Sequence, residues 1–149
     1  MILQIGKLFG LSMENRLLAV EATILLFVAR MAVISLPFRW IAKTLGEKEN
    51  PKGEIDFSPK KPDLELNRIG WTIRRIGDLT PWNSNCLAQA ITAQKMLARR
   101  GRASQMYFGL KHSDEGKMEA HAWLKSGDTI LTGGSEFEPY TVVAVFRKG

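Results

Sequence analysis

Apolar residues follow a helical period in the first two thirds of the chain and alternate with polar residues in the last third. Residues 12–35 are predicted to form one long helix, with Ser12 as its N-cap and Pro37 just beyond its end. Apolar side chains surround most of this helix, so we expect it to be buried on several sides, by its own domain or by a partner. Residues 38–45 are predicted to form a short second helix.

Two further helices are predicted on either side of a polar break. Asp63 is a suitable N-cap for a helix that continues to about Gly77 and has one apolar face. Pro81 and the polar residues after it block continuation of that helix. The next helix is predicted at residues 86–100. Its candidate N-caps are Asn83, Ser84 and Asn85.

Alternating apolar residues predict a set of strands after these helices. The predicted strands are 105–110, 119–125, 129–132 and 140–146. In the second of them, alternation places His121 on one face together with Glu119 and Trp123. Short strands joined by turns favour an antiparallel meander. Helices followed by such a meander define an α+β fold.

A run of charged residues and prolines at 47–62 predicts an exposed linker. It separates an apolar helical arm, residues 1–46, from residues 63–149, which carry the other helices and the strands. The arm is too small and too apolar to fold alone, and 149 residues suit one domain of ordinary size. We therefore expect a single domain overall.

The apolar arm also raises the question of a membrane. Glu21 and Arg30 interrupt its apolar run, whereas a spanning helix needs about 20 predominantly apolar residues. A buried helix is the main expectation, and peripheral membrane contact through residues 12–45 is the alternative. The arm lacks the features of a signal peptide, so we expect a cytoplasmic protein. The alternative is a cytoplasmic protein that associates with the membrane surface.

The net charge indicates which kinds of binding partner to expect, and the cysteine content indicates the redox state of the cellular compartment. The net charge of +6 favours an acidic partner, such as an acidic peptide or an anionic membrane surface. The sequence shows no aromatic RNA-binding motif, so we do not expect it to bind nucleic acid. Cys86 is the only cysteine, which excludes an internal disulfide and fits a reducing cytoplasm.

Cys86 and His121 are the candidate catalytic residues. A helix start surrounds Cys86 with partial positive charge and free N–H groups, which favour the reactive thiolate. His121, on a strand that passes the helix start, can act as general base and general acid. The N–H groups of the helix start, with the side chain of Asn83 or Asn85, can form an oxyanion hole. Together these residues predict a cysteine hydrolase.

The same residues allow other interpretations. A single cysteine is often a small buried apolar residue, and a single histidine often has a structural or surface role. In that case the chain would be a non-catalytic peptide-binding module or a membrane-associated scaffold. A metal site at Cys86, His112 and His121 is less favoured, because the spacing typical of metal ligands is missing. We expect no metal, nucleotide or other cofactor, and an exposed His112.

From PWNSNCLAQA to the terminal YTVV, the sequence resembles the transglutaminase-like cysteine protease of lasso-peptide biosynthesis, the microcin-processing B-protein type. The resemblance covers roughly residues 65–146 and rests on the order and spacing of CL-x-QA, AHAWL and YTVV. It implies a transglutaminase- or papain-like fold and a leader peptidase. By the family pattern, Cys86 is the nucleophile and His121 the general base and acid.

The resemblance also implies a substrate and partners. Such a peptidase removes the leader from a ribosomally made lasso-peptide precursor, and a separate ATP-dependent cyclase then closes the macrolactam on the freed amine. Stand-alone versions work with a small leader-binding protein that presents the precursor. This chain shows no separate segment for that task, so we expect such a partner.

One position departs from the family pattern. An Asp on the strand after the histidine completes the family's triad, whereas the matching position here is Gly133. The imidazole could instead be oriented by Asp128, Glu119 or Thr132. A backbone carbonyl or a residue from elsewhere could do the same, and the sequence leaves these alternatives open.

Overall fold

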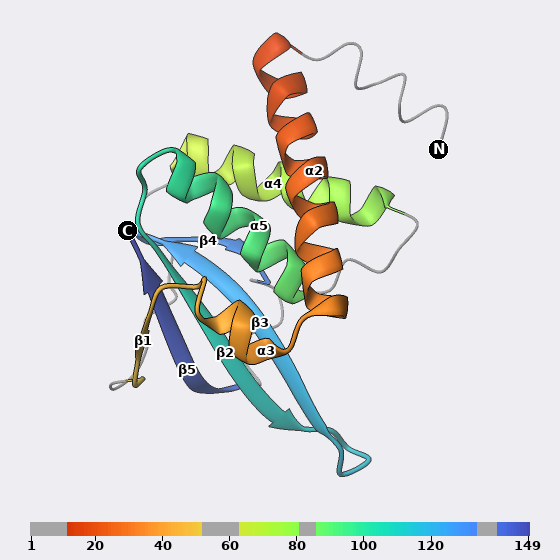
Figure 1. Cartoon of the computed structure of the whole chain (residues 1–149), viewed down its shortest axis with the longest axis vertical. Helices are drawn as coiled ribbons and strands as arrows, with labels where there is room; N and C mark the ends of the chain where they lie inside the picture. Colours follow the sequence, from red (N-terminus) through yellow and green to blue (C-terminus); the bar gives the residue numbers. More distant parts are fainter. Residues whose placement is uncertain (1–11, 52–62, 81–85, 134–139) are drawn as a thin grey trace.

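The computed structural model describes residues 12–51, 63–80, 86–133 and 140–149, in which helices cover one face of an antiparallel sheet (Figure 1). The helices are α2 (Met13–Ser35), α3 (Phe38–Ala42), α4 (Leu64–Leu79) and α5 (Cys86–Arg99). The strands are β1 (Glu47–Glu49), β2 (Ser104–His112), β3 (Met118–Ser126), β4 (Thr129–Thr132) and β5 (Thr141–Lys148). The predicted α+β class is confirmed.

The starts of α2 and α4 are capped as predicted. The Ser12 hydroxyl accepts a hydrogen bond from the Asn15 N–H at 3.4 Å, and the Asp63 carboxylate accepts one from the Leu66 N–H at 3.1 Å. Helix α4 continues through Gly77 to Leu79, because the first residue with extended backbone is Thr80. Helix α3 ends at Ala42, earlier than predicted. The candidate caps of α5 lie in 81–85, outside the described residues.

The order of the strands corrects the predicted meander. The order is β1-β5-β2-β3-β4, and every neighbouring pair is antiparallel. Strands β2, β3 and β4 follow one another as predicted, but β5 pairs with β2 instead of extending the meander beyond β4. This position sets Phe146 of β5 against Phe108 of β2, with ring centroids 5.6 Å apart, so β5 adds apolar contacts to the core.

Strand β1 lies at the start of the segment predicted to be a linker. Residues 47–49 pair with β5, and Arg147 Nε lies 3.4 Å from Glu49 Oε1. Gly46 precedes the strand with φ 101°, and a Cβ there would overlap the Arg147 carbonyl oxygen. Only glycine permits this approach. The remainder of the predicted linker, residues 52–62, lies outside the described residues.

Helix α5 is the central helix, since it contacts α2, α4 and the strands β2, β3 and β4. Its Gln94 is fully buried, and Nε2 donates a hydrogen bond to the Leu45 carbonyl at 2.9 Å, which fixes the end of the apolar arm to the core. One side of α2 also enters the core through Leu18, Ala22 and Leu26. The opposite side of α2 is exposed in the single chain, so its own domain buries one side only, and burial of the other side by a partner stays a prediction.

Candidate functional site

Cys86 is the first residue of α5, where the sequence predicted a helix start. Its side chain is half-buried and packs against the core on the helix side of the sheet. Ala88, Ala90 and Ala93 of the same helix are fully buried, and their small side chains let α5 pack closely against its neighbours. The thiol is therefore held at the N-terminal end of a well-packed helix.

His121 lies in β3, directly opposite Gly109 of β2. Only 8% of its surface is exposed. Alternation along β3 places Ala122 and Leu124 in the core beneath the helices, and His121 and Trp123 on the other face, as predicted.

Two aromatic rings enclose the imidazole of His121. The Trp123 ring centroid lies 5.7 Å from the imidazole centroid in a stacked arrangement, and the Tyr140 ring centroid lies 5.0 Å away. Gly109 makes room for both rings, because a Cβ there would lie 2.7 Å from Tyr140 Cβ and 2.9 Å from the Trp123 ring. The rings restrict the orientation of the imidazole.

The backbone of Gly133 supplies the imidazole's hydrogen-bond partner. His121 Nε2 lies 3.0 Å from the Gly133 carbonyl oxygen. A carbonyl oxygen can only accept a hydrogen bond, so this contact requires the hydrogen on Nε2 and leaves the lone pair of the neutral imidazole on Nδ1. The geometry therefore selects the tautomer in which Nδ1 can act as a base.

Gly133 cannot carry a side chain in this conformation. Its φ is +73°, and a Cβ would lie 2.7 Å from the Ala122 carbonyl oxygen and 2.8 Å from Trp123 Cβ. The same Cβ would lie 3.0 Å from His121 Nε2. The position of the family's Asp is thus occupied by a residue whose backbone, rather than a carboxylate, contacts the imidazole.

The sequence offered Glu119, Asp128 and Thr132 as side chains that could orient the imidazole, and none of them is observed in that role. The Glu119 carboxylate lies 3.2 Å from Lys111 Nζ, and its hydrogen bond raises the pKa of Lys111. Asp128 is exposed in the turn between β3 and β4. The Thr132 hydroxyl is buried and has no hydrogen-bond partner among the described residues. Of the alternatives, the backbone carbonyl is the one observed.

The two candidate catalytic residues lie on elements that touch, since α5 contacts β3, but the Cys86 side chain packs on the helix side of the sheet and the His121 side chain lies on the other face. Within the described ranges, no hydrogen bond joins the Cys86 thiol to His121, whose ring nitrogen contacts Gly133. Asn83 and Asn85 fall in 81–85, outside the described residues, so their part in an oxyanion hole stays a prediction. His112 is exposed at the end of β2, as predicted.

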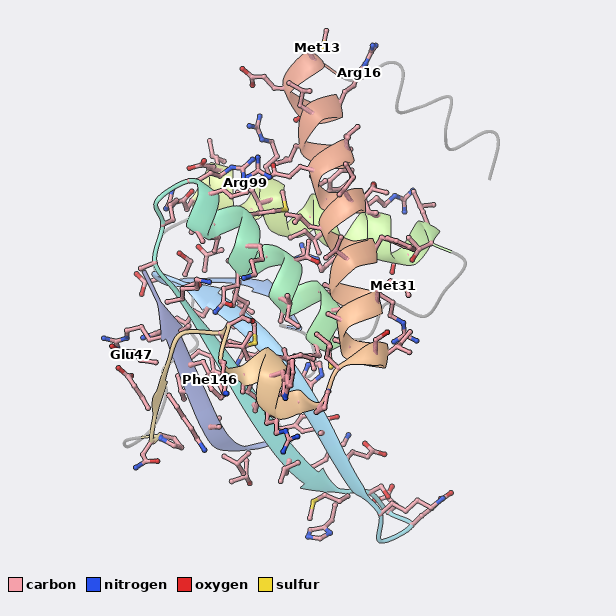
Figure 2. The ribbon with its side chains drawn as sticks, in the orientation of Figure 1. Met13, Arg16, Met31, Glu47, Arg99 and Phe146 are labelled. Carbon is pink, nitrogen blue, oxygen red and sulfur yellow. The ribbon has the colours of Figure 1, made fainter. Side chains whose placement is uncertain are left out.

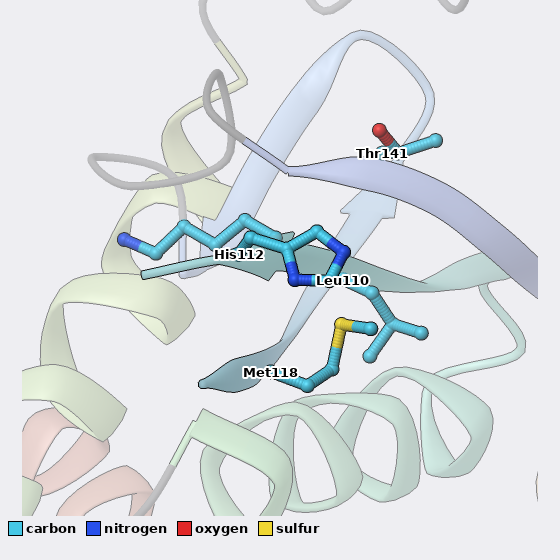
Figure 3. A pocket seen from close by; sticks show the side chains of 5 residues that line it. Leu110, His112, Met118 and Thr141 are labelled. Carbon is cyan, nitrogen blue, oxygen red and sulfur yellow. The ribbon is translucent and has the colours of Figure 1, made fainter. Parts of the chain in front are cut away.

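An open cavity of about 380 Å³ lies near the outer end of the β2–β3 hairpin (Figure 3). It is lined by Leu110, Lys111, His112, Met118 and Thr141. The histidine that lines it is His112 and not His121. This cavity is therefore separate from the imidazole that Gly133 orients. In the described part of the chain, no three His, Cys, Asp or Glu side chains are grouped to hold a metal ion.

The sequence pattern of the transglutaminase-like superfamily matches residues 32–145. This range includes α3, α4, α5 and strands β1 to β4, and it ends within β5. The chain belongs to this superfamily. The superfamily includes cysteine peptidases and transglutaminases, which suits a helix-start cysteine and an oriented histidine. No curated protein and no solved structure matches the chain.

Sequence reasoning left three parts of the site unassigned. Trp123 could have been found, because alternation already placed it beside His121 on one strand face. Tyr140 approaches the imidazole only because β5 pairs with β2, which the sequence did not predict. No sequence feature identifies the Gly133 carbonyl as the partner of the imidazole, because every residue carries a backbone carbonyl. The Gly133-Gly134 pair indicated only that the strand ends there.

Proposed function

We propose that the chain is a cysteine peptidase that removes the leader from a lasso-peptide precursor before macrolactam cyclisation. The observation that carries the proposal is the 3.0 Å contact between His121 Nε2 and the Gly133 carbonyl oxygen. It supports a histidine whose Nδ1 is free to take a proton, on a strand next to the helix that begins with Cys86. Superfamily membership and the resemblance to lasso-peptide leader proteases supply the reaction class.

The proposed acylation step requires the Cys86 thiol and the His121 imidazole, which lie on opposite faces of the sheet, to approach each other. His121 Nδ1 then takes the proton of the Cys86 thiol, and the thiolate attacks the carbonyl carbon of the scissile amide. The N–H groups at the start of α5 stabilise the oxyanion of the tetrahedral intermediate. The imidazolium then donates its proton to the leaving amine. The C–N bond breaks, the core peptide leaves with a free amino terminus, and the leader remains on Cys86 as a thioester.

In the proposed deacylation step, a water molecule attacks the thioester carbonyl while Nδ1 accepts its proton. The C–S bond breaks, the thiolate regains a proton from the imidazolium, and the leader leaves with a new carboxylate. The Gly133 carbonyl keeps Nε2 as the donor throughout. A carbonyl is a neutral acceptor and stabilises the imidazolium less than a carboxylate does, because charge-assisted hydrogen bonds are roughly twice as strong. We expect a lower intrinsic rate than a triad with a carboxylate would give.

The chain is expected to act in the cytoplasm with a small leader-binding protein that presents the precursor and an ATP-dependent cyclase that uses the freed amine. The net charge of +6 suits an acidic peptide or partner surface. These partners follow from the resemblance and from the expected need for a separate presenting protein.

The test is a mass-spectrometric cleavage assay on the full chain, the precursor encoded beside its gene and the leader-binding partner. Wild type is expected to produce two fragments whose masses sum to that of the precursor plus one water. Cys86→Ala and His121→Ala should produce neither fragment while keeping the circular dichroism spectrum of wild type. His112→Ala is the matched histidine control and should cleave normally. An intact precursor with wild type, when the partner demonstrably binds it, would overturn the proposal.

The same assay separates hydrolysis from crosslinking. A transglutaminase reaction joins a glutamine side chain to an amine and releases ammonia, so the product would be heavier than the precursor by the acceptor amine less ammonia. Fragments that carry one added water support the peptidase. Crosslinked products without fragments would assign the Cys86 chemistry to acyl transfer instead.

A further inference from the structure

The side of α2 that faces away from the core carries a continuous apolar stripe, which we call the α2 seam. Its residues are Met13, Leu17, Val20, Ile24, Phe27, Met31 and Ile34. Each of them is between 46% and 69% exposed. Figure 2 labels Met13 and Met31 near opposite ends of this helix, and Figure 1 shows its first turns extending beyond α4.

The spacing of the seam is that of a coiled coil. Successive seam residues are alternately four and three positions apart, which is the heptad pattern of apolar a and d positions. At 100° per residue, the seam is centred about 170° around the helix from the buried stripe that contains Leu18, Ala22 and Leu26. A second helix can therefore dock on the seam without displacing α4 or α5.

The charges that flank the seam are complementary to those of a second copy. Arg16 and Arg30 follow one edge of the seam, and Glu14 and Glu21 follow the other. Glu21 is bound to Arg99 and Arg100 within the chain, and the exposed Glu14 lies 3.5 Å from Arg68. When two copies pair in parallel, the basic edge of one helix faces the acidic edge of the other. Antiparallel pairing would set the basic edges against each other. The Glu14 side chain is 79% exposed beside the seam, so an anionic membrane would meet a carboxylate there and suits the seam less.

The apolar area is also sufficient for a dimer. Seven large side chains that are each about half exposed present on the order of 700 Å² of apolar surface, compared with about 800 Å² per partner in a standard interface. A soluble monomer rarely exposes a contiguous apolar patch above about 600 Å². Glu21 and its Arg100 partner fix the helix to the core, so the seam is presented by a rigid element.

We propose that the chain forms a homodimer through a parallel, two-stranded pairing of α2 along the seam. By length and composition α2 could also cross a membrane, but that test is equally passed by core helices, and 28% of its apolar window is buried inside the protein. The proposal is independent of the peptidase proposal, because the seam lies on the side of α2 opposite the core that holds α5.

Sedimentation velocity of the full chain over a range of concentrations tests the dimer. Wild type is expected to be dimeric, and Ile24→Lys and Ile24→Glu are each expected to weaken dimerisation at least 100-fold. An equimolar mixture of the two variants should recover a dimer, because parallel pairing places residue 24 of one copy beside residue 24 of the other. Val143→Lys changes an apolar side chain of similar exposure, 48%, on β5 and should leave the dimer unchanged.

A crosslinking experiment tests the orientation. In a Cys86→Ala chain, Leu17→Cys is expected to form an intermolecular disulfide in air, because in-register parallel helices bring the two residue-17 positions together. The Cys86→Ala chain without the new cysteine is the control. A wild type that is monomeric at every concentration, dimers that survive Ile24→Lys, or flotation of monomers with anionic vesicles would each overturn the proposal.

Discussion

At Gly133, a backbone carbonyl occupies the place to which the resemblance to lasso-peptide proteases assigns an Asp carboxylate. The residue combines a positive φ, close contacts that exclude a Cβ, and a carbonyl aimed at His121 Nε2. These properties depend on one another, because any side chain would move the carbonyl away from the imidazole. An Asp introduced here would therefore not restore the family's triad.

Gly133→Ala is expected to impair both stability and cleavage. The strained φ and the contact with the Ala122 carbonyl should lower the free energy of unfolding by about 1–3 kcal/mol. Displacement of the carbonyl should lower kcat for precursor cleavage by about 10-fold or more, with little change in KM. Urea unfolding and single-turnover cleavage measure the two effects.

Gly127→Ala is the matched control for this substitution. Gly127 also has a positive φ, 55°, but no heavy atom lies within 4 Å of the position of its Cβ. Gly127→Ala should lower the free energy of unfolding only by the cost of placing alanine at a positive φ, and it should retain the wild-type kcat. If both variants had the same kcat, the Gly133 carbonyl would not be orienting the histidine.

At the scale of elements, α4 depends on a glycine for its contact with β4. A Cβ at Gly70 would lie 2.7 Å from the Leu131 carbonyl oxygen, which also accepts a hydrogen bond from Arg74. The helix thus accepts a residue of poor helix propensity because the backbones of α4 and β4 approach each other closely.

Gly70→Ala is expected to destabilise the protein although alanine is the better helix former by about 1 kcal/mol. The overlap with β4 should outweigh that gain and lower the free energy of unfolding by about 1–3 kcal/mol. Asn67→Ala, at an exposed position of the same helix, should raise it by a few tenths of a kcal/mol. Thermal unfolding measures both variants, and a higher Tm for Gly70→Ala would contradict the close packing of α4 on β4.

The ion pair between α2 and α5 predicts a pH dependence. Arg100 donates hydrogen bonds to both Glu21 carboxylate oxygens, at 3.1 and 2.7 Å, and these lower the pKa of Glu21 from its ordinary value of 4.5. A carboxylate with a lowered folded-state pKa contributes stability above its unfolded pKa and loses it as the pH falls through the folded pKa.

Glu21→Gln should therefore lower the free energy of unfolding by about 1–2 kcal/mol at neutral pH, and this difference should shrink as the pH falls below 4.5 through the lowered pKa. Urea unfolding at a series of pH values tests it. Glu115→Gln is the control, because the Glu115–Lys117 pair is 78% exposed on both sides and should contribute little. A difference for Glu21→Gln that stayed constant with pH would show that the charge of Glu21 does not stabilise the fold.

At the scale of the whole molecule, the folded unit begins before the matched family region. The superfamily match starts at residue 32, within α2, whereas Leu18, Ala22 and Leu26 are already part of the core. The apolar arm therefore belongs to the same core as the candidate site.

Removal of residues 1–31 is expected to abolish cooperative unfolding. Loss of a buried leucine alone costs about 2–5 kcal/mol, and a domain has only about 5–15 kcal/mol of stability. Removal of residues 1–11, which precede α2, should keep the circular dichroism spectrum and a sharp thermal transition. A folded, cooperative chain lacking residues 1–31 would show that the arm is not needed by the core.

Sequence by itself determined the local structure and the position of the candidate nucleophile, Cys86, at a helix start. Capping residues and apolar period predicted the helices, alternation predicted β2 to β5, and a polar break before Cys86 predicted a thiol at a helix start. These signals succeed because they arise from residues within a few positions of one another.

Tertiary structure alone decided the rest, since those features depend on residues that are distant in sequence. The pairing of β5 with β2 brings Tyr140 to His121, and the charged strand β1 forms only because β5 offers it an edge. The exposure of one side of α2 is decided by where α4 and α5 pack. The Gly133 carbonyl reaches the imidazole through backbone geometry, which is set by the folded chain rather than by the identity of any side chain.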